Sequence, residues 1–105
     1  MICELCKLNV DEKYITKHHL IPKTYHNNKK AQKQFTSNEM NFTINLCTSC
    51  HKKIHSCLKE KDLAFKYNTI QKLLTVPEIE KWYNWRNKHP NFNDGVSKQN
   101  SYVKN

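Results

Sequence analysis

Two C-x-x-C pairs, Cys3/Cys6 and Cys47/Cys50, constrain the fold of this 105-residue chain more than any other feature. Tetrahedral zinc takes four thiolate ligands, and each pair presents two sulfurs from one tight turn. The pairs are 40 residues apart, which exceeds the common zinc-finger spacing of about 15–20 residues. Because loop closure costs little extra free energy for added length, the sequence predicts one structural zinc shared by both pairs.

A redox C-x-x-C motif and a pair of disulfides are the alternatives for these cysteines. The first lacks its usual βαβ pattern, and the second is rare in a reducing compartment. We expect such a compartment, the cytoplasm, and no membrane partner. The N-terminus shows no secretory signal, and no apolar run approaches the ~20 residues that span a bilayer. Cys57 is left over and is interpreted as a small apolar residue on a helix face.

The net charge of the chain is +9, from 18 basic and 9 acidic residues. A positive surface attracts a polyanion and releases its counterions on binding, so nucleic acid is the natural partner. The alternative is that the lysines merely keep the protein soluble. Only Arg86 is an arginine, which leaves 17 lysines. Lysine suits phosphate, whereas bidentate reading of guanine favours arginine, so weak sequence discrimination is expected.

Apolar periodicity predicts an α+β domain. Residues 9–17 indicate a turn and a strand, and Pro22 ends the extended stretch that follows. Residues 24–40 are polar and without a clear period, which predicts a long loop that could include a helical turn. Phe42, Ile44 and Leu46 alternate, so a second strand is expected over residues 41–46.

The C-terminal half of the chain is expected to be helical. One helix should run from the second C-x-x-C pair to about residue 58, and a second element should span roughly residues 60–74. The segment Thr75-Val76-Pro77-Glu78 has the form of a capping box with proline in the first turn, and it predicts a last helix, which Pro90 ends. We therefore expect a zinc-bound core over residues 1–58, a helical extension of the same domain over 59–90 with two helices, and a flexible polar tail over 91–105.

Four of the six histidines fall into two pairs. His51 and His55 are four residues apart on a predicted helix, so their side chains share a face, with about 5–6 Å between Cβ atoms. His18 and His19 are adjacent on an extended segment, so they point to opposite sides. One of them can therefore join the helical pair as a metal ligand, while the other addresses a water molecule. Imidazole suits zinc, nickel and other transition ions.

With these motifs the chain resembles the HNH family of endonucleases. The matching residues are Cys3-x-x-Cys6, His18-His19-Leu20-Ile21-Pro22, Asn41 and Leu46-Cys47-x-x-Cys50-His51-x-x-x-His55. The resemblance implies the ββα-metal fold, in which a β-hairpin and a helix surround one catalytic divalent ion, with the four cysteines on a separate structural zinc. It covers about residues 1–58. The later pattern Leu63-x-x-x-Tyr67-Asn68-Thr69 and the Trp82/Trp85 helix are similar to the tail of a bacterial subgroup.

The resemblance implies a role for each histidine of the motif. His18 takes the position of the first metal ligand, which is often aspartate in the family. His19 takes that of the general base that activates water. His51 matches the closing histidine of the motif and is a metal ligand, and His55 matches variants that use a third histidine.

The family asparagine orients the base, and two residues could supply it. Asn41 is favoured over Asn45, although its gap to Cys47 is one residue longer than in the commonest pattern.

The expected reaction is hydrolysis of DNA phosphodiester bonds. A histidine with a pKa near neutrality can take the proton of the attacking water. A divalent ion (Mg²⁺, Mn²⁺, Ni²⁺ or Zn²⁺) can polarise the phosphate and stabilise the departing oxygen. Double-stranded DNA is the expected partner, and cutting both strands with one site per chain favours a homodimer. Four lysines that flank the motifs could hold phosphates or could simply be solvated: Lys17, Lys23, Lys52 and Lys53.

Two other classes of protein stay open at this point. A zinc-ribbon module that binds nucleic acid without cutting it explains the cysteines and the charge, but leaves the two histidine pairs unexplained. A protein-interaction zinc module gives no reason for the net charge of +9.

Overall fold

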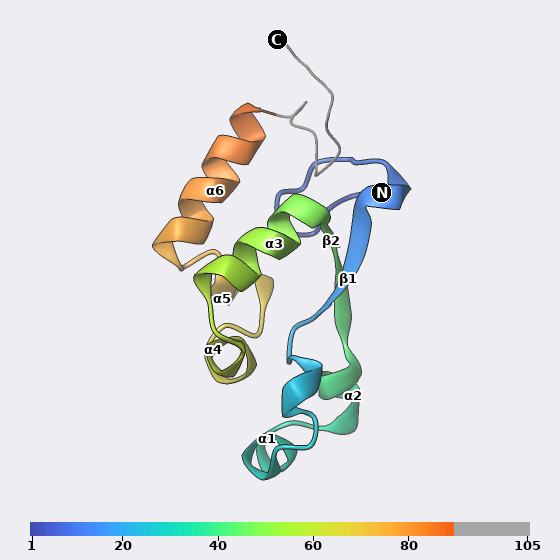
Figure 1. Cartoon of the computed structure of the whole chain (residues 1–105), viewed down its shortest axis with the longest axis vertical. Coiled ribbons are helices and arrows are strands. Elements are labelled where there is room, and N and C mark those ends of the chain that lie inside the picture. Colours follow the sequence, from blue (N-terminus) through green and yellow to red (C-terminus); the bar gives the residue numbers. More distant parts are fainter. Residues whose placement is uncertain (90–105) are drawn as a thin grey trace.

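A two-stranded antiparallel sheet and the helix that follows it form the centre of the computed structural model, which describes residues 1–89 (Figure 1). Strand β1 (Ile15–His19) pairs with β2 (Thr43–Cys47), with Ile15 opposite Cys47 and His19 opposite Thr43. Helix α3 (Thr48–Cys57) begins directly after β2 and contacts both strands. The chain is therefore an α+β protein.

The other elements of the described residues are short helices and one longer one. They are the 3₁₀ helices η1 (Glu12–Tyr14) and η2 (Lys23–Tyr25), and the α-helices α1 (Lys29–Gln34), α2 (Ser37–Asn41), α4 (Glu60–Phe65), α5 (Ile70–Leu73) and α6 (Pro77–Lys88). Helix α6 packs against α3, as Figure 1 shows. The predicted polar tail over residues 91–105 and the stop at Pro90 lie outside the described residues.

The turn and strand predicted over residues 9–17 correspond to η1 and β1, and β1 continues to His19. Asp11 caps the 3₁₀ turn of η1 by accepting a hydrogen bond from the Lys13 amide (3.1 Å), so regular strand begins only at Ile15.

Residues 24–40 form two short helices, where a long loop that could include a helical turn was predicted. The Asn28 side chain accepts the Ala31 amide and starts α1. Thr36 and Glu39 form a reciprocal capping box that starts α2. Helix α2 continues through Asn41, so β2 begins at Thr43 and not at residue 41 as predicted. Both helices are anchored in a small second core, which contains Ile21, Ala31, Met40 and Ala64.

Residues 60–74 also differ from the prediction, since they form two helices instead of one. At the end of α4, the side-chain amide of Asn68 donates to the Ala64 carbonyl (2.9 Å). At the start of α5, the Thr69 hydroxyl accepts a hydrogen bond from the backbone amide of Lys72 (3.1 Å). Within residues 58–89, three helices therefore follow α3, where two were expected. The predicted capping box at Thr75 is absent from the described structure, because its hydroxyl donates backwards to the Lys72 carbonyl (2.6 Å).

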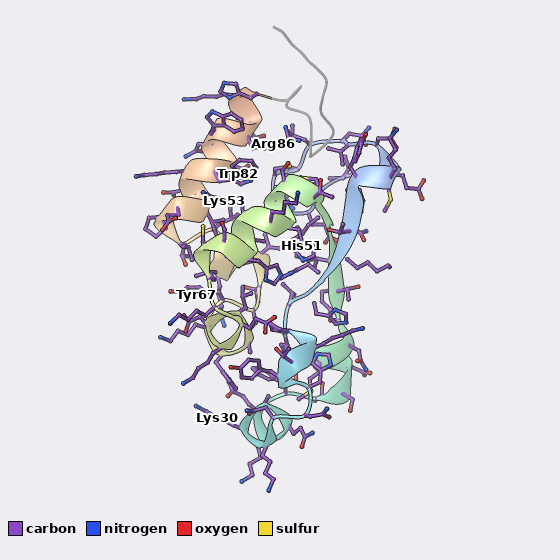
Figure 2. The ribbon with its side chains drawn as sticks, in the orientation of Figure 1. Lys30, His51, Lys53, Tyr67, Trp82 and Arg86 are labelled. Carbon is purple, nitrogen blue, oxygen red and sulfur yellow. The ribbon has the colours of Figure 1, made fainter. Side chains whose placement is uncertain are left out.

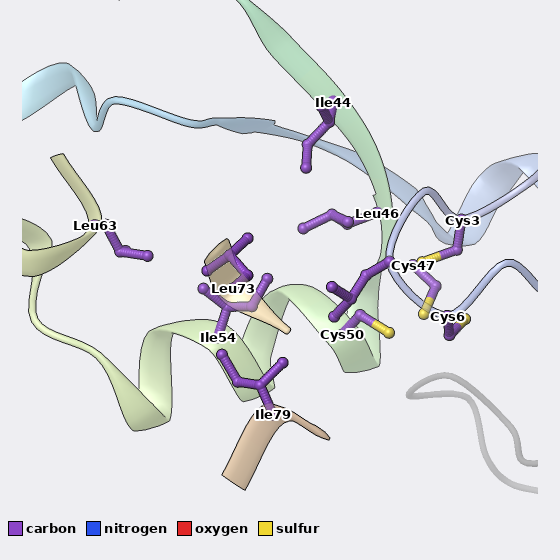
Figure 3. Close-up of a cluster of buried hydrophobic side chains, with 11 residues drawn as sticks. Cys3, Cys6, Ile44, Leu46, Cys47, Cys50, Ile54, Leu63, Leu73 and Ile79 are labelled. Carbon is purple, nitrogen blue, oxygen red and sulfur yellow. The ribbon is translucent and has the colours of Figure 1, made fainter. Parts of the chain in front are cut away.

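One buried cluster joins the sheet, α3 and the C-terminal helices (Figure 3). Leu46 and Ile54 meet Leu63, Leu73 and Ile79 there, and all five are fully buried. Each such side chain contributes about 1.5–3 kcal/mol when it leaves water. Residues on both sides of the predicted 58/59 boundary thus share one core. Within residues 1–89 we find no helix with the length and apolar character needed to cross a membrane.

Candidate metal centres

The two C-x-x-C pairs meet in one buried cluster, the cysteine cluster (Cys3, Cys6, Cys47 and Cys50). All four side chains are fully buried, and their sulfurs lie within 4.8 Å of one another. A tetrahedron with Zn–S distances of about 2.3 Å would place the sulfurs roughly 3.8 Å apart. All five cysteines of the chain are free thiols, so the disulfide alternative is not realised. The cluster can therefore hold a metal ion such as zinc, as predicted.

The first C-x-x-C pair, Cys3/Cys6, lies in a tight turn that is hydrogen-bonded to the sheet. Lys7 adopts a positive φ of 67°, and its amide donates to the Cys3 carbonyl (2.8 Å). The Glu4 amide donates to the Asn45 carbonyl (2.8 Å), and the Glu4 carboxylate accepts the Asn45 amide (2.6 Å). The turn thus lies along the edge of β2 that does not pair with β1. These two hydrogen bonds hold the sulfurs of the first pair close to Cys47 and Cys50.

Hydrogen bonds among the four thiols lower the pKa values of Cys3 and Cys6 and raise those of Cys47 and Cys50. Hydrogen bonds with Cys47 first and Cys50 next lower the pKa of the Cys3 thiol, although burial opposes this. A thiolate is the form that binds metal. From the other side, the indole N–H of Trp82 on α6 donates to the Cys50 sulfur (3.3 Å), and Figure 2 shows this side chain between α6 and α3. The C-terminal extension therefore contributes a donor to the cysteine cluster.

A second group, the histidine cluster, contains His18, His51 and His55. Strand β1 supplies the first and α3 supplies the other two; in Figure 2, His51 lies on the side of α3 toward β1. Ring centroids are 5.1 Å apart for His18 and His51, 5.4 Å for His18 and His55, and 4.9 Å for the helical pair. One ring nitrogen of each lies within 4.8 Å of the others.

His18 is the most buried member of the histidine cluster, with an exposed fraction of 2%. Burial first, and then His51 and His55, lower the pKa of His18 to about 3, so the ring is neutral at physiological pH. Its Nε2 atom is buried and has no hydrogen-bond partner among residues 1–89. Buried ring nitrogens are normally satisfied. A divalent ion bound by this nitrogen would satisfy it, and imidazole is a ligand that suits such an ion.

His19 follows on the other side of β1, as the strand alternation predicts. It is half-buried, and its ring lies 5.6 Å from that of His26. Burial first, then Lys23 and His26, lower the pKa of His19. His18 and His19 nevertheless line the same opening, the central hollow, of about 500 Å³. Its walls are Lys17, His18, His19, Pro22, Lys23, His51, His55 and Glu60.

Neither candidate asparagine lies in hydrogen-bond contact with His19 within the described part of the chain. Asn41 is exposed at the end of α2, and Asn45 lies opposite Lys17 in β2. The role of an asparagine in orienting the base therefore stays a prediction. His26 was not selected from the sequence, although its ring packs against His19 and its Nε2 bonds the Ile21 carbonyl (2.9 Å).

A curated relative places this chain among known proteins. The uncharacterized protein YisB of Bacillus subtilis (strain 168) is 33% identical over 89 residues, which make up 85% of this chain and 76% of YisB. The chain belongs to the YisB family. No protein-family model matches it, and no solved structure matches it. The description of YisB states no activity. Functional conclusions for this member of the YisB family therefore depend on the geometry of the cysteine cluster and the histidine cluster.

The predicted phosphate-binding lysines of this YisB-family chain do not all lie at the histidine cluster. Lys17 and Lys23 line the central hollow, and Lys52 lines a neighbouring hollow of about 280 Å³ with His51 and His55. Lys53 lines neither, because two residues along a helix turn it roughly 200° away from His51. Its contact with phosphate remains a prediction.

Sequence reasoning missed two lysines and a threonine near the histidine cluster. Lys59 and Lys61 line a third hollow of about 900 Å³, which shares His55 and Glu60 with the central hollow. No local pattern distinguishes them from the other lysines. Thr16 lies 2.8 Å from His51 Nδ1, and its position two residues before His18 on a strand was a usable signal, since such residues share a face.

Proposed function

We propose that this chain is a metal-dependent HNH endonuclease with weak sequence specificity, which hydrolyses phosphodiester bonds of double-stranded DNA. The observation that carries the proposal is the unsatisfied Nε2 of buried His18, which lies beside His51 and His55 in a hollow that also contains His19. A histidine that served only to fill the core would normally have a hydrogen-bond partner for a buried ring nitrogen. Three imidazoles that converge on it therefore indicate an ion site.

The arrangement of elements supports the ββα-metal fold within this proposal. Two antiparallel strands are followed at once by a helix, and the three ligands come from the first strand and that helix. The cysteine cluster lies at the other end of the same strand pair, where Cys47 closes β2. A structural zinc there would fix the start of α3, and with it the positions of His51 and His55.

The chain's own residues supply the rest of the proposed reaction. His19 accepts a proton from water, whose oxygen forms a bond to phosphorus while the bond to the 3′ oxygen breaks. The leaving oxygen takes a proton from solvent. A divalent ion held by His18, His51 and His55 supplies Lewis-acid stabilisation of the phosphate charge. Lys17, Lys23 and Lys52 hold neighbouring phosphates by charge.

Cleavage of supercoiled plasmid tests this function directly. We expect the zinc-loaded chain to nick plasmid when Mg²⁺, Mn²⁺, Ni²⁺ or additional Zn²⁺ is supplied, and chelation of that ion to stop it. His18→Ala should abolish nicking because it removes the most buried ligand. His89→Ala, at the end of α6, is the matched control and should cut like wild type. If the protein binds plasmid but cuts with none of the four ions, it is the non-catalytic zinc-ribbon module instead.

Binding to DNA should fall steeply with salt and equally for unrelated duplexes. Each phosphate contact contributes about −0.9 to the slope of log affinity against log salt. Lys23→Ala should therefore make the slope shallower by about 1, whereas Lys33→Ala on α1 should not change it. Fluorescence anisotropy with two unrelated duplexes over a salt series measures both slopes. One sequence bound far more tightly than the other would contradict weak specificity.

A further inference from the structure

Thr16 connects the sheet to the histidine cluster through two hydrogen bonds. Its side-chain oxygen lies 3.0 Å from the Leu46 carbonyl oxygen, to which it donates, and 2.8 Å from His51 Nδ1. Thr16 is half-buried and lies opposite Leu46 in the strand pair. The hydroxyl is therefore held between a strand carbonyl and a residue of α3.

The chemistry of the hydroxyl decides which tautomer His51 adopts. A hydroxyl has one hydrogen and a carbonyl oxygen can only accept, so the hydrogen points to Leu46. The Thr16 oxygen must then accept from His51, which places a hydrogen on Nδ1 and leaves Nε2 with a lone pair. We infer that Thr16 is a positioning residue that holds His51 in the tautomer and orientation needed to bind a divalent ion through Nε2.

The inference rests on the proposed metal centre and adds to it a residue outside the ligand set. Metal-binding histidines usually donate their second ring N–H to a protein oxygen, and losing that partner typically costs 10–100-fold in metal affinity. Thr16 and His18 share one face of β1, so a single strand supplies both a ligand and the partner of another ligand. For His55, no ring-nitrogen hydrogen bond occurs within residues 1–89, so Thr16 supplies the one ring-nitrogen hydrogen bond of the helical pair among these residues.

Ni²⁺ affinity separates a hydrogen-bonding role from a packing role. Ni²⁺ is titrated calorimetrically into the zinc-loaded full-length chain. Thr16→Val keeps the shape of the side chain and removes the hydroxyl, so Ni²⁺ affinity should fall by about 10–100-fold. Thr16→Ser keeps the hydroxyl and should bind within a few-fold of wild type. Equal affinity of wild type and Thr16→Val would overturn the inference and leave the metal centre intact, whereas failure of wild type to bind Ni²⁺ would overturn the proposed three-histidine metal centre itself.

The tautomer can also be measured without any ion at the histidine cluster. Long-range ¹H–¹⁵N correlation spectra distinguish the protonated from the unprotonated ring nitrogen of His51. In wild type we expect the hydrogen on Nδ1, and in Thr16→Val a mixture of tautomers. A wild-type ring with its hydrogen on Nε2 would refute the assignment, even if the valine variant proved too unstable to study.

Discussion

Replacing Cys47 with serine is expected to unfold the domain. Apparent binding free energies of structural zinc in small domains are about 10–16 kcal/mol, and the whole stability of a small protein is typically about 5–15 kcal/mol. Cys47 ends β2, caps α3 and contributes to the buried cluster, so its loss removes a metal ligand at the point where both elements meet. Removing the zinc with a chelator should have the same effect on the unmodified chain.

Cys57→Ser is the matched control, because Cys57 is half-buried at the end of α3, the helix that begins directly after Cys47, and lies outside the cysteine cluster. Circular dichroism and bound zinc are measured for both variants. We expect Cys57→Ser to keep its helix content, its zinc and a sharp thermal transition, and Cys47→Ser to lose all three. A Cys47→Ser variant with native helix content and a cooperative transition would show that no structural zinc stabilises this fold.

His19→Ala is expected to lower the rate of plasmid cleavage by about 10²–10⁴-fold, the usual cost of losing a general base. The side chain is not one of the three proposed ligands and is only half-buried. The variant should therefore fold, retain zinc, bind Ni²⁺ and bind DNA as wild type does. Single-turnover cleavage and calorimetry measure the two properties separately.

His51→Ala provides the comparison that separates base from ligand. Since it removes one of three imidazoles, it should weaken binding of the divalent ion as well as cleavage. Added imidazole should restore part of the activity of His19→Ala, because a small molecule can replace a missing base. Wild-type cleavage by His19→Ala would show that another group activates the water.

Local spacing in the sequence determined the parts of this protein that depend on neighbouring residues. The C-x-x-C interval places two sulfurs in one turn, so the four-cysteine cluster could be predicted without knowledge of the fold. The interval of four between His51 and His55 places both on one helix face, and adjacency on a strand separates His18 from His19. These relations follow from backbone periodicity, which is the same in any tertiary context.

Tertiary structure alone decided the contacts between segments that are distant in the chain. The Thr16–His51 bond joins residues 35 apart, the Trp82–Cys50 bond residues 32 apart, and the Asn45–Glu4 bond residues 41 apart. Helices α1 and α2 begin at local caps, Asn28 and Thr36, but both are short and lack an apolar period, and packing against Ile21 and Ala64 anchors them. No periodicity encodes such pairs, because they exist only once the sheet, α3 and the C-terminal helices have packed into one core.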